Sequence, residues 1–229
     1  MAKIIKKHWD IILVGGIGLV LAMMAMLPID IGLPIPSVEA ATTSASAVAV
    51  SATVASSITL TIAGVASVTT VVTGVTTTVL TNATSVAFGT IDSSAKQIAA
   101  HDLTVSTNAI NGYTTNAKYD HALQISSTTT ITDWTGTNAT PTTPFASTGT
   151  EAFGYTTNDF TLGTAPTTRF STTTGGMWAK FETGDKEVAY SATSTASQTT
   201  RIGYQVGVAA TTEAGTYTDT VTYTAVGSF

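Results

Sequence analysis

Residues 214–225 read AGTYTDTVTYTA and carry the clearest fold signal in the chain. Every second residue from Thr216 to Thr224 is threonine, and the alternate positions hold tyrosine, valine and alanine, with Asp219 as the exception. Successive side chains of a β-strand point to opposite faces. The alternation therefore predicts a strand with one face in water and one face on a core.

The same two-residue alternation recurs along the chain. The predicted core-facing sets lie in Val48–Val54, Ile58–Ile62, Leu103–Thr107, Tyr113–Tyr119 and Ile202–Val208. After residue 40 the sequence shows no apolar stripe with helical spacing. We therefore expect an all-β fold of about ten strands, arranged as a two-sheet antiparallel β-sandwich of the immunoglobulin-like kind rather than a small barrel.

Glycine-containing turn signals separate several of these strands. Glu213–Gly215 predicts an antiparallel hairpin that joins Ile202–Val208 to the final strand, and Asn111–Gly112 predicts a second turn. The repeated Val-Thr-Thr units in Val65–Leu80 fit either a hairpin around Gly74 or a low-complexity arm.

Two long polar segments, Ser126–Thr150 and Thr161–Gly176, predict loops. Loops of this length in a compact domain are usually functional or mobile. Four aromatic residues in or near them are either exposed binding groups or packing residues, and packing is the favoured interpretation. These residues are Trp134, Tyr155, Trp178 and Phe181.

The first forty residues predict a signal peptide that forms a helix. Three lysines precede the apolar run Ile11–Leu27, prolines follow, and Val38–Ala40 supplies small residues at the positions that a signal peptidase reads. The alternative is a retained single-pass anchor, which would be the chain's only contact with a membrane. The predicted organisation is therefore residues 1–40 as signal peptide, 41–56 as an extended arm and 57–229 as the β-sandwich domain. The expected location is secreted, at the cell surface.

Charge and cysteine content exclude several classes of function. Between Ala41 and Phe229 there are six Lys and Arg against eleven Asp and Glu, so nucleic acid is not an expected partner. The chain has no cysteine, which excludes disulfides, thiolate metal sites and cysteine nucleophiles. The absence of disulfides in an exported protein favours a bacterial surface over a eukaryotic secretory pathway.

Threonine dominates the composition, with fifty residues between Ala41 and Phe229. Its branched Cβ suits a strand and its hydroxyl tolerates water. A disordered, O-glycosylated stalk is the alternative, but such stalks lack patterned valine, isoleucine and tyrosine. Asn82 and Asn138 begin N-glycosylation sequons, a motif that threonine-rich sequence produces by chance.

The residues give no catalytic constellation, so we expect no enzyme, no catalytic or cofactor-binding residues and no metal site. His101-Asp102 and Asp120-His121 are neighbours that strand geometry would point to opposite faces, and a surface histidine is the simpler reading. Asp92-Ser93-Ser94 lacks the glycine of an aspartic-protease motif, and no Gly-x-Ser-x-Gly elbow occurs.

The remaining candidates for a catalytic or metal-binding role are scattered acidic residues. A glycoside hydrolase would need two carboxylates that face each other, and nothing in their spacing singles out a pair among Glu151, Asp159, Glu182 and Asp185. Calcium binding near Glu182, Asp185 and Glu187 is disfavoured, because Lys186 lies where a ligand is needed.

Four runs resemble the WxL-type surface domains of Gram-positive bacteria and threonine-rich exported proteins of candidate-phyla (patescibacterial) lineages. The runs are VAFGTI (86–91), LTVSTNAINGYT (103–114), EAFGY (151–155) and AGTYTDTVTYTA (214–225). The resemblance implies a β-sandwich held noncovalently at the cell wall. Trp134-Thr135-Gly136, Trp178-Ala179-Lys180 and Tyr223-Thr224-Ala225 depart from Trp-x-Leu, so peptidoglycan binding is not carried over.

The expected function is structural or adhesive: a surface protein that binds or self-assembles, with a filament subunit that uses strand addition as one form. Its partners would be further copies of itself, other surface proteins or cell-wall glycan. The alternatives are a small outer-membrane β-barrel and, least favoured, a carbohydrate-active enzyme.

Overall fold

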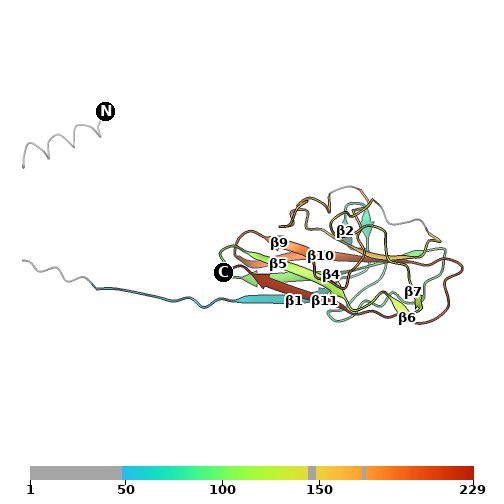
Figure 1. Ribbon diagram of the computed structural model, residues 1–229, viewed down its shortest axis with the longest axis horizontal. Coiled ribbons are helices and arrows are strands. Elements are labelled where there is room, and N and C mark those ends of the chain that lie inside the picture. The colour runs from blue at the N-terminus through green and yellow to red at the C-terminus, as the bar shows by residue number, and fades with distance from the viewer. Residues whose placement is uncertain (1–47, 144–147, 172–173) are drawn as a thin grey trace, which may run out of the picture. The chain divides into compact units, whose positions relative to one another are not determined.

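The computed structural model describes residues 48–143, 148–171 and 174–229. The described part of the chain is all-β, as the alternation predicts, and its strands form several antiparallel sheets (Figure 1). No helix in these ranges is long and apolar enough to span a membrane. The predicted signal peptide and residues 41–47 of the arm lie outside the described residues. Ala52–Phe229 forms one compact unit.

Two sheets make up most of this unit. The larger sheet has the order β1-β4-β10-β8, and the smaller has the order β11-β5-β9. The strands of the larger sheet are β1 (Ile58–Gly64), β4 (Lys96–Thr107), β8 (Ala152–Thr157) and β10 (Thr195–Gly207). Those of the smaller sheet are β5 (Tyr113–Tyr119), β9 (Lys186–Ser191) and β11 (Val221–Gly227). Two short hairpins are added by β2 (Thr70–Val72) with β3 (Val75–Thr76) and by β6 (Gln124–Ser126) with β7 (Thr129–Thr130).

A hydrophobic core joins the two sheets. It takes Leu103, Ile202 and Val206 from the larger sheet and Ala117 and Val188 from the smaller one. The predicted core faces of 103–107 and 113–119 are confirmed, because alternate residues there are buried. Stacked aromatic rings complete this core, with the centroids of the Tyr155 and Phe181 rings 4.5 Å apart.

The larger sheet is also covered on its other face. Val71, Val72 and Val75 of the β2–β3 hairpin pack with Trp178 against that face. The predicted alternation in 202–208 is therefore incomplete: Ile202 to Gly207 are all buried, because both faces are covered. Of the two alternatives for Val65–Leu80, the structure shows the hairpin around Gly74, where β2 pairs with β3. Gly74 has φ 76°, a left-handed conformation that glycine adopts without steric cost.

The predicted hairpin through Glu213–Gly215 is wrong. β10 pairs with β4 and β8, whereas β11 pairs with β5, so residues 208–220 cross from one sheet to the other. The turn at Asn111–Gly112 is confirmed, with the Gly112 amide donating to the Ala109 carbonyl at 3.0 Å. It too connects strands of different sheets. Alternation identifies strands, but it carries no information about which strands become neighbours.

The predicted core-facing strand Val48–Val54 is also wrong. These residues form no strand, and the side chains of Val48, Val50 and Val54 are 82%, 91% and 82% exposed. β1 begins at Ile58, which pairs with Thr107, the last residue of β4. The sheet therefore offers no partner strand beyond that point.

Candidate functional site

A groove lies at the end of the unit where β10 leads into residues 208–220. Its volume is about 1260 Å³, above the roughly 300–1,000 Å³ of a typical small-ligand pocket. Its lining comes from both sheets, with Ile62 from β1, Phe153 from β8, Val206 from β10 and Val221 from β11. Two connecting segments, residues 83–93 and 208–220, supply much of the rest, and Leu123 and Ile131 also contribute.

The groove walls are held by side-chain and backbone hydrogen bonds. Thr218 exchanges two backbone hydrogen bonds with Gln124, at 3.1 and 2.9 Å. The Glu151 carboxylate accepts from Thr212 Oγ1 at 2.6 Å and from the Thr132 amide at 2.9 Å. Burial raises the pKa of Glu151, but these hydrogen bonds outweigh it and leave the pKa lowered. Glu151 thus links residues 208–220 to the segment that contains Thr132.

A chain of hydrogen bonds runs along the groove lining. His101 Nε2 lies 2.7 Å from the Asn82 carbonyl oxygen, so it must donate there, and His101 Nδ1 accepts from Tyr204 Oη at 3.0 Å. Tyr204 Oη in turn accepts from Tyr223. The expectation that His101 lies on the surface is wrong, since it is 6% exposed. Burial lowers the pKa of His101 and raises the pKa of both tyrosines, so this chain is uncharged at neutral pH.

Asp219 also lines the groove, and its carboxyl group lies in an environment that is unusual for an aspartate. Both of its carboxylate oxygens are buried with no hydrogen-bond partner among the described residues. Burial, followed by the neighbouring Asp120 carboxylate, raises the pKa of Asp219 to about 7. The sequence carried the signal for this residue, because it is the one acid on the core-facing side of the final alternation.

Asp120 and His121 lie beside Asp219. Contrary to the expectation that strand geometry separates them, His121 Nε2 is 3.6 Å from Asp120 Oδ1, because β5 ends at Tyr119 and the pair follows it. One ligand atom from each of Asp120, His121 and Asp219 lies within 4.8 Å of the others. Two carboxylates and one imidazole suit a divalent transition metal, but three side chains are short of the four ligands of a closed structural zinc site.

We expect Asp219→Asn to gain stability over the wild type as pH rises. Since the folded-state pKa of Asp219 is raised, folding favours its protonated form; that stabilisation is lost between about pH 4 and pH 7. Asparagine cannot ionise, so the Tm difference between variant and wild type should increase from pH 5 to pH 8 in thermal unfolding scans. In the exposed control Asp92→Asn, the replaced carboxyl has a pKa lowered by Ser94, so its Tm difference should not increase. An equal increase in both variants would refute the assignment.

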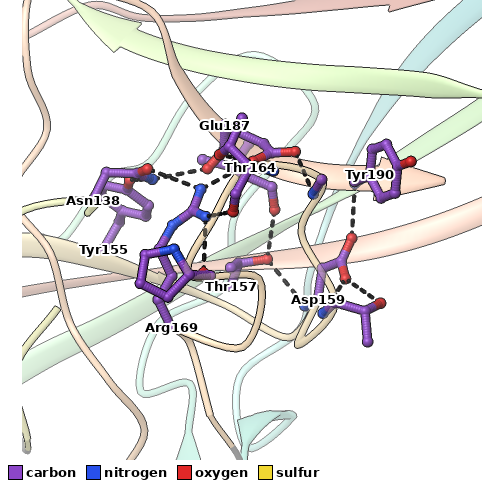
Figure 2. Close-up of polar contacts among 12 residues, drawn as sticks. Asn138, Tyr155, Thr157, Asp159, Thr164, Arg169, Glu187 and Tyr190 are labelled. Atoms are coloured by element: carbon purple, nitrogen blue, oxygen red, sulfur yellow. Dashed lines mark hydrogen bonds and ion pairs between the residues drawn. The ribbon is translucent and has the colours of Figure 1, made fainter. Parts of the chain in front are cut away.

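A buried ionic network forms a second polar cluster, away from the groove. Arg169 and Glu187 pair at 3.0 Å with their side chains 3% and 5% exposed (Figure 2). Glu187 also accepts from the amides of Gly163 and Thr164 at 2.7 and 2.9 Å, and Arg169 donates to the carbonyl of Thr164 at 2.6 Å. Burial raises the pKa of Glu187, but these hydrogen bonds and Arg169 outweigh it and leave the pKa lowered.

Asn138 extends this network to a second loop. Its amide donates to Tyr155 Oη at 2.7 Å and to the Glu187 carbonyl at 2.8 Å, and its oxygen accepts from Arg169 (Figure 2). The predicted loops 126–150 and 161–176 are thus tied to each other and to β9 over their described parts. Asn138 is buried, so its sequon offers no accessible amide, whereas Asn82 is exposed.

The remaining predicted candidates each have a separate structural partner. Asp159 accepts from the Tyr190 amide at 2.8 Å, Glu182 pairs with Lys186 at 3.0 Å, and Asp185 pairs with Lys118 at 3.6 Å. Because Glu187 binds Arg169, these acids do not converge on a calcium site. The Asp92 carboxylate accepts a hydrogen bond from the Ser94 amide in an exposed turn. Packing is confirmed for the four aromatics: Tyr155, Trp178 and Phe181 are buried, and Trp134 is partly buried.

Comparisons of the chain with protein-family models, curated proteins and solved structures found no match. The groove is the feature that sequence reasoning missed. Its lining comes from at least six separate segments of the chain, so no short sequence motif could have predicted it.

Proposed function

We propose that this is an exported surface protein that works by binding and self-assembly, in which the arm of one copy adds a strand to another. The observation that carries the proposal is the exposed arm. Residues 48–57 are all exposed and contain no charge, and Val48, Val50 and Val54 stand on alternate positions. An extended segment with this pattern is typical of strand addition, in which backbone hydrogen bonds give affinity and alternate side chains fill pockets.

Free strand edges in the same unit support the proposal. β1 pairs only with β4, and β11 pairs only with β5, so each has one side without a strand partner among the described residues. Such an edge presents unpaired amide and carbonyl groups, which recruit a further strand unless they are protected. We also propose that the two sheets form an immunoglobulin-like β-sandwich.

Further elements of the proposal rest on sequence. They are cleavage of the signal peptide at Ala40, residence at a bacterial cell surface, and action without catalysis or a cofactor. Besides further copies of the chain, other surface proteins or cell-wall glycan are the proposed partners.

We expect Val50→Asp to reduce multimer formation by the protein that begins at Ala41. A buried aspartate in place of valine loses apolar contact and costs desolvation. Ser51→Asp is the matched control, because it adds the same charge to the opposite face of the arm. Sedimentation velocity over a concentration series should show a multimer midpoint at least tenfold higher for Val50→Asp than for Ser51→Asp. Monomeric wild-type protein at all concentrations would refute self-assembly.

A further inference from the structure

We infer that the acceptor for the arm is the groove between β1 and β11, filled by residues 48–54 of a second copy; this inference rests on the proposed self-assembly. The groove touches Ile62 of β1 and the residues Val221 and Tyr223 of β11. β1 is an edge strand of the larger sheet and β11 is an edge strand of the smaller one, and the two lie side by side (Figure 1). An entering strand would therefore meet apolar side chains close to two strands that each have one side without a strand partner among the described residues.

The chemistry of the groove fits an uncharged apolar strand. Its lining contains no lysine or arginine, which disfavours phosphate, sulfate or an anionic glycan as the occupant. Asp92 and Glu213 are exposed at its border, and Asp219 has a raised pKa. Apolar side chains of the larger sheet and of residues 83–93 supply the contact surface: Ile62, Val86, Phe88, Ile91, Phe153 and Val206. The arm brings three valines, and no charge lies between Ala41 and Ser57.

The arm of the same copy starts in the wrong place to fill this groove. Asn108, next to the end of β4, donates to the Ala55 carbonyl at 2.7 Å and accepts from the Ser57 amide at 2.8 Å. These bonds fix the base of the arm at the Ile58 end of β1. The groove lies toward the other end, where Ile62 pairs with Leu103 and Gly64 pairs with His101. The base of the arm and the groove therefore lie toward opposite ends of β1.

This placement makes the contact head-to-tail. An arm that leaves one end and a groove at the other form a heterologous contact, which continues as an open chain of subunits unless the rotation closes a ring. Seven residues of strand span about 23 Å, enough to cross one face of a small domain. The expected assembly is a filament in which each copy fills the groove of the next.

Disulfide trapping tests the placement, because the chain has no cysteine of its own. Val50→Cys protein is mixed with dye-labelled Ala87→Cys protein under mild oxidation; Ala87 is exposed and lines the groove. We expect the mixed dimer to form at least tenfold faster than with Thr183→Cys, whose exposed position lies in the connection before β9. Equal rates for the two acceptors would overturn the groove assignment.

A peptide titration separates this inference from the proposed function. A fluorescent peptide of residues 41–57 is titrated with protein that begins at Ala55, and saturable binding is expected. Ala87→Trp, which adds a large side chain to the groove lining, should weaken that binding at least tenfold, while Thr183→Trp should not. Wild-type multimers with no effect of Ala87→Trp would overturn the groove and leave self-assembly standing. Groove-dependent peptide binding by a protein that stays monomeric would support the groove and overturn self-assembly.

Discussion

Arg169→Met is expected to destabilise the protein by about 3–5 kcal/mol, because it leaves the buried Glu187 carboxylate without its cation. The variant also removes the donors to Asn138 and to the Thr164 carbonyl, so the two loops lose the direct link that Arg169 makes between them. Urea unfolding of the protein that begins at Ala41, followed by tryptophan fluorescence, measures the change in free energy of unfolding.

Lys186→Met is the matched control for this prediction. Lys186 pairs with Glu182 at 3.0 Å, but their side chains are 36% and 27% exposed. An exposed pair of this kind contributes about 0–1 kcal/mol, so the same cation-to-methionine change should cost little there. Similar losses in the two variants would contradict the special role of the buried pair.

Deletion of residues 41–54 is expected to abolish multimers while the fold stays intact. The deletion removes all three arm valines and keeps Ala55 and Ser57, which hydrogen bond to Asn108. Since no described residue of the arm before Ala55 is buried, the Tm should change little. Sedimentation velocity measures the multimers, and far-ultraviolet circular dichroism with a thermal scan measures the fold.

Two results would contradict this prediction. Loss of the β-sheet signal on deletion would show that the arm belongs to its own domain's core. Multimers of unchanged size with an intact fold would show that subunits associate through another surface. In contrast, recovery of assembly on addition of the 41–57 peptide is not expected, because a free peptide fills the groove without joining two copies.

The alternation of apolar and polar residues was sufficient to predict an all-β protein and several of its strands. β5, β11 and the core-facing residues of β4 are confirmed, because a strand with one wet face must alternate to bury its apolar side chains. The turn at Gly112 was predicted, and the hairpin at Gly74 was one of two alternatives that the sequence left open. Both glycines have positive φ, which glycine adopts without steric cost.

The same pattern could not distinguish a strand from an arm. Val48–Val54 and Ile58–Ile62 alternate alike, but only the second segment lies opposite β4. Pairing also decided that β10 and β11 belong to different sheets, although a turn signal lies between them. A local pattern specifies which side chains seek burial, and only tertiary packing decides what covers them.

The candidate site depended on tertiary structure for the same reason. From the sequence, Asp219 was an irregularity in a strand and Arg169 one of a few scattered charges. The fold brings Asp120 beside Asp219 and Glu187 beside Arg169, although these pairs lie far apart in the chain. Burial then changes their chemistry, because it removes the water that would screen or solvate each charge. The sequence by itself determined that the chain is all-β, where several of its strands lie, and that residues 41–57 carry no charge. The packing of the two sheets determined the groove, its raised carboxyl pKa and the end of β1 from which the arm departs.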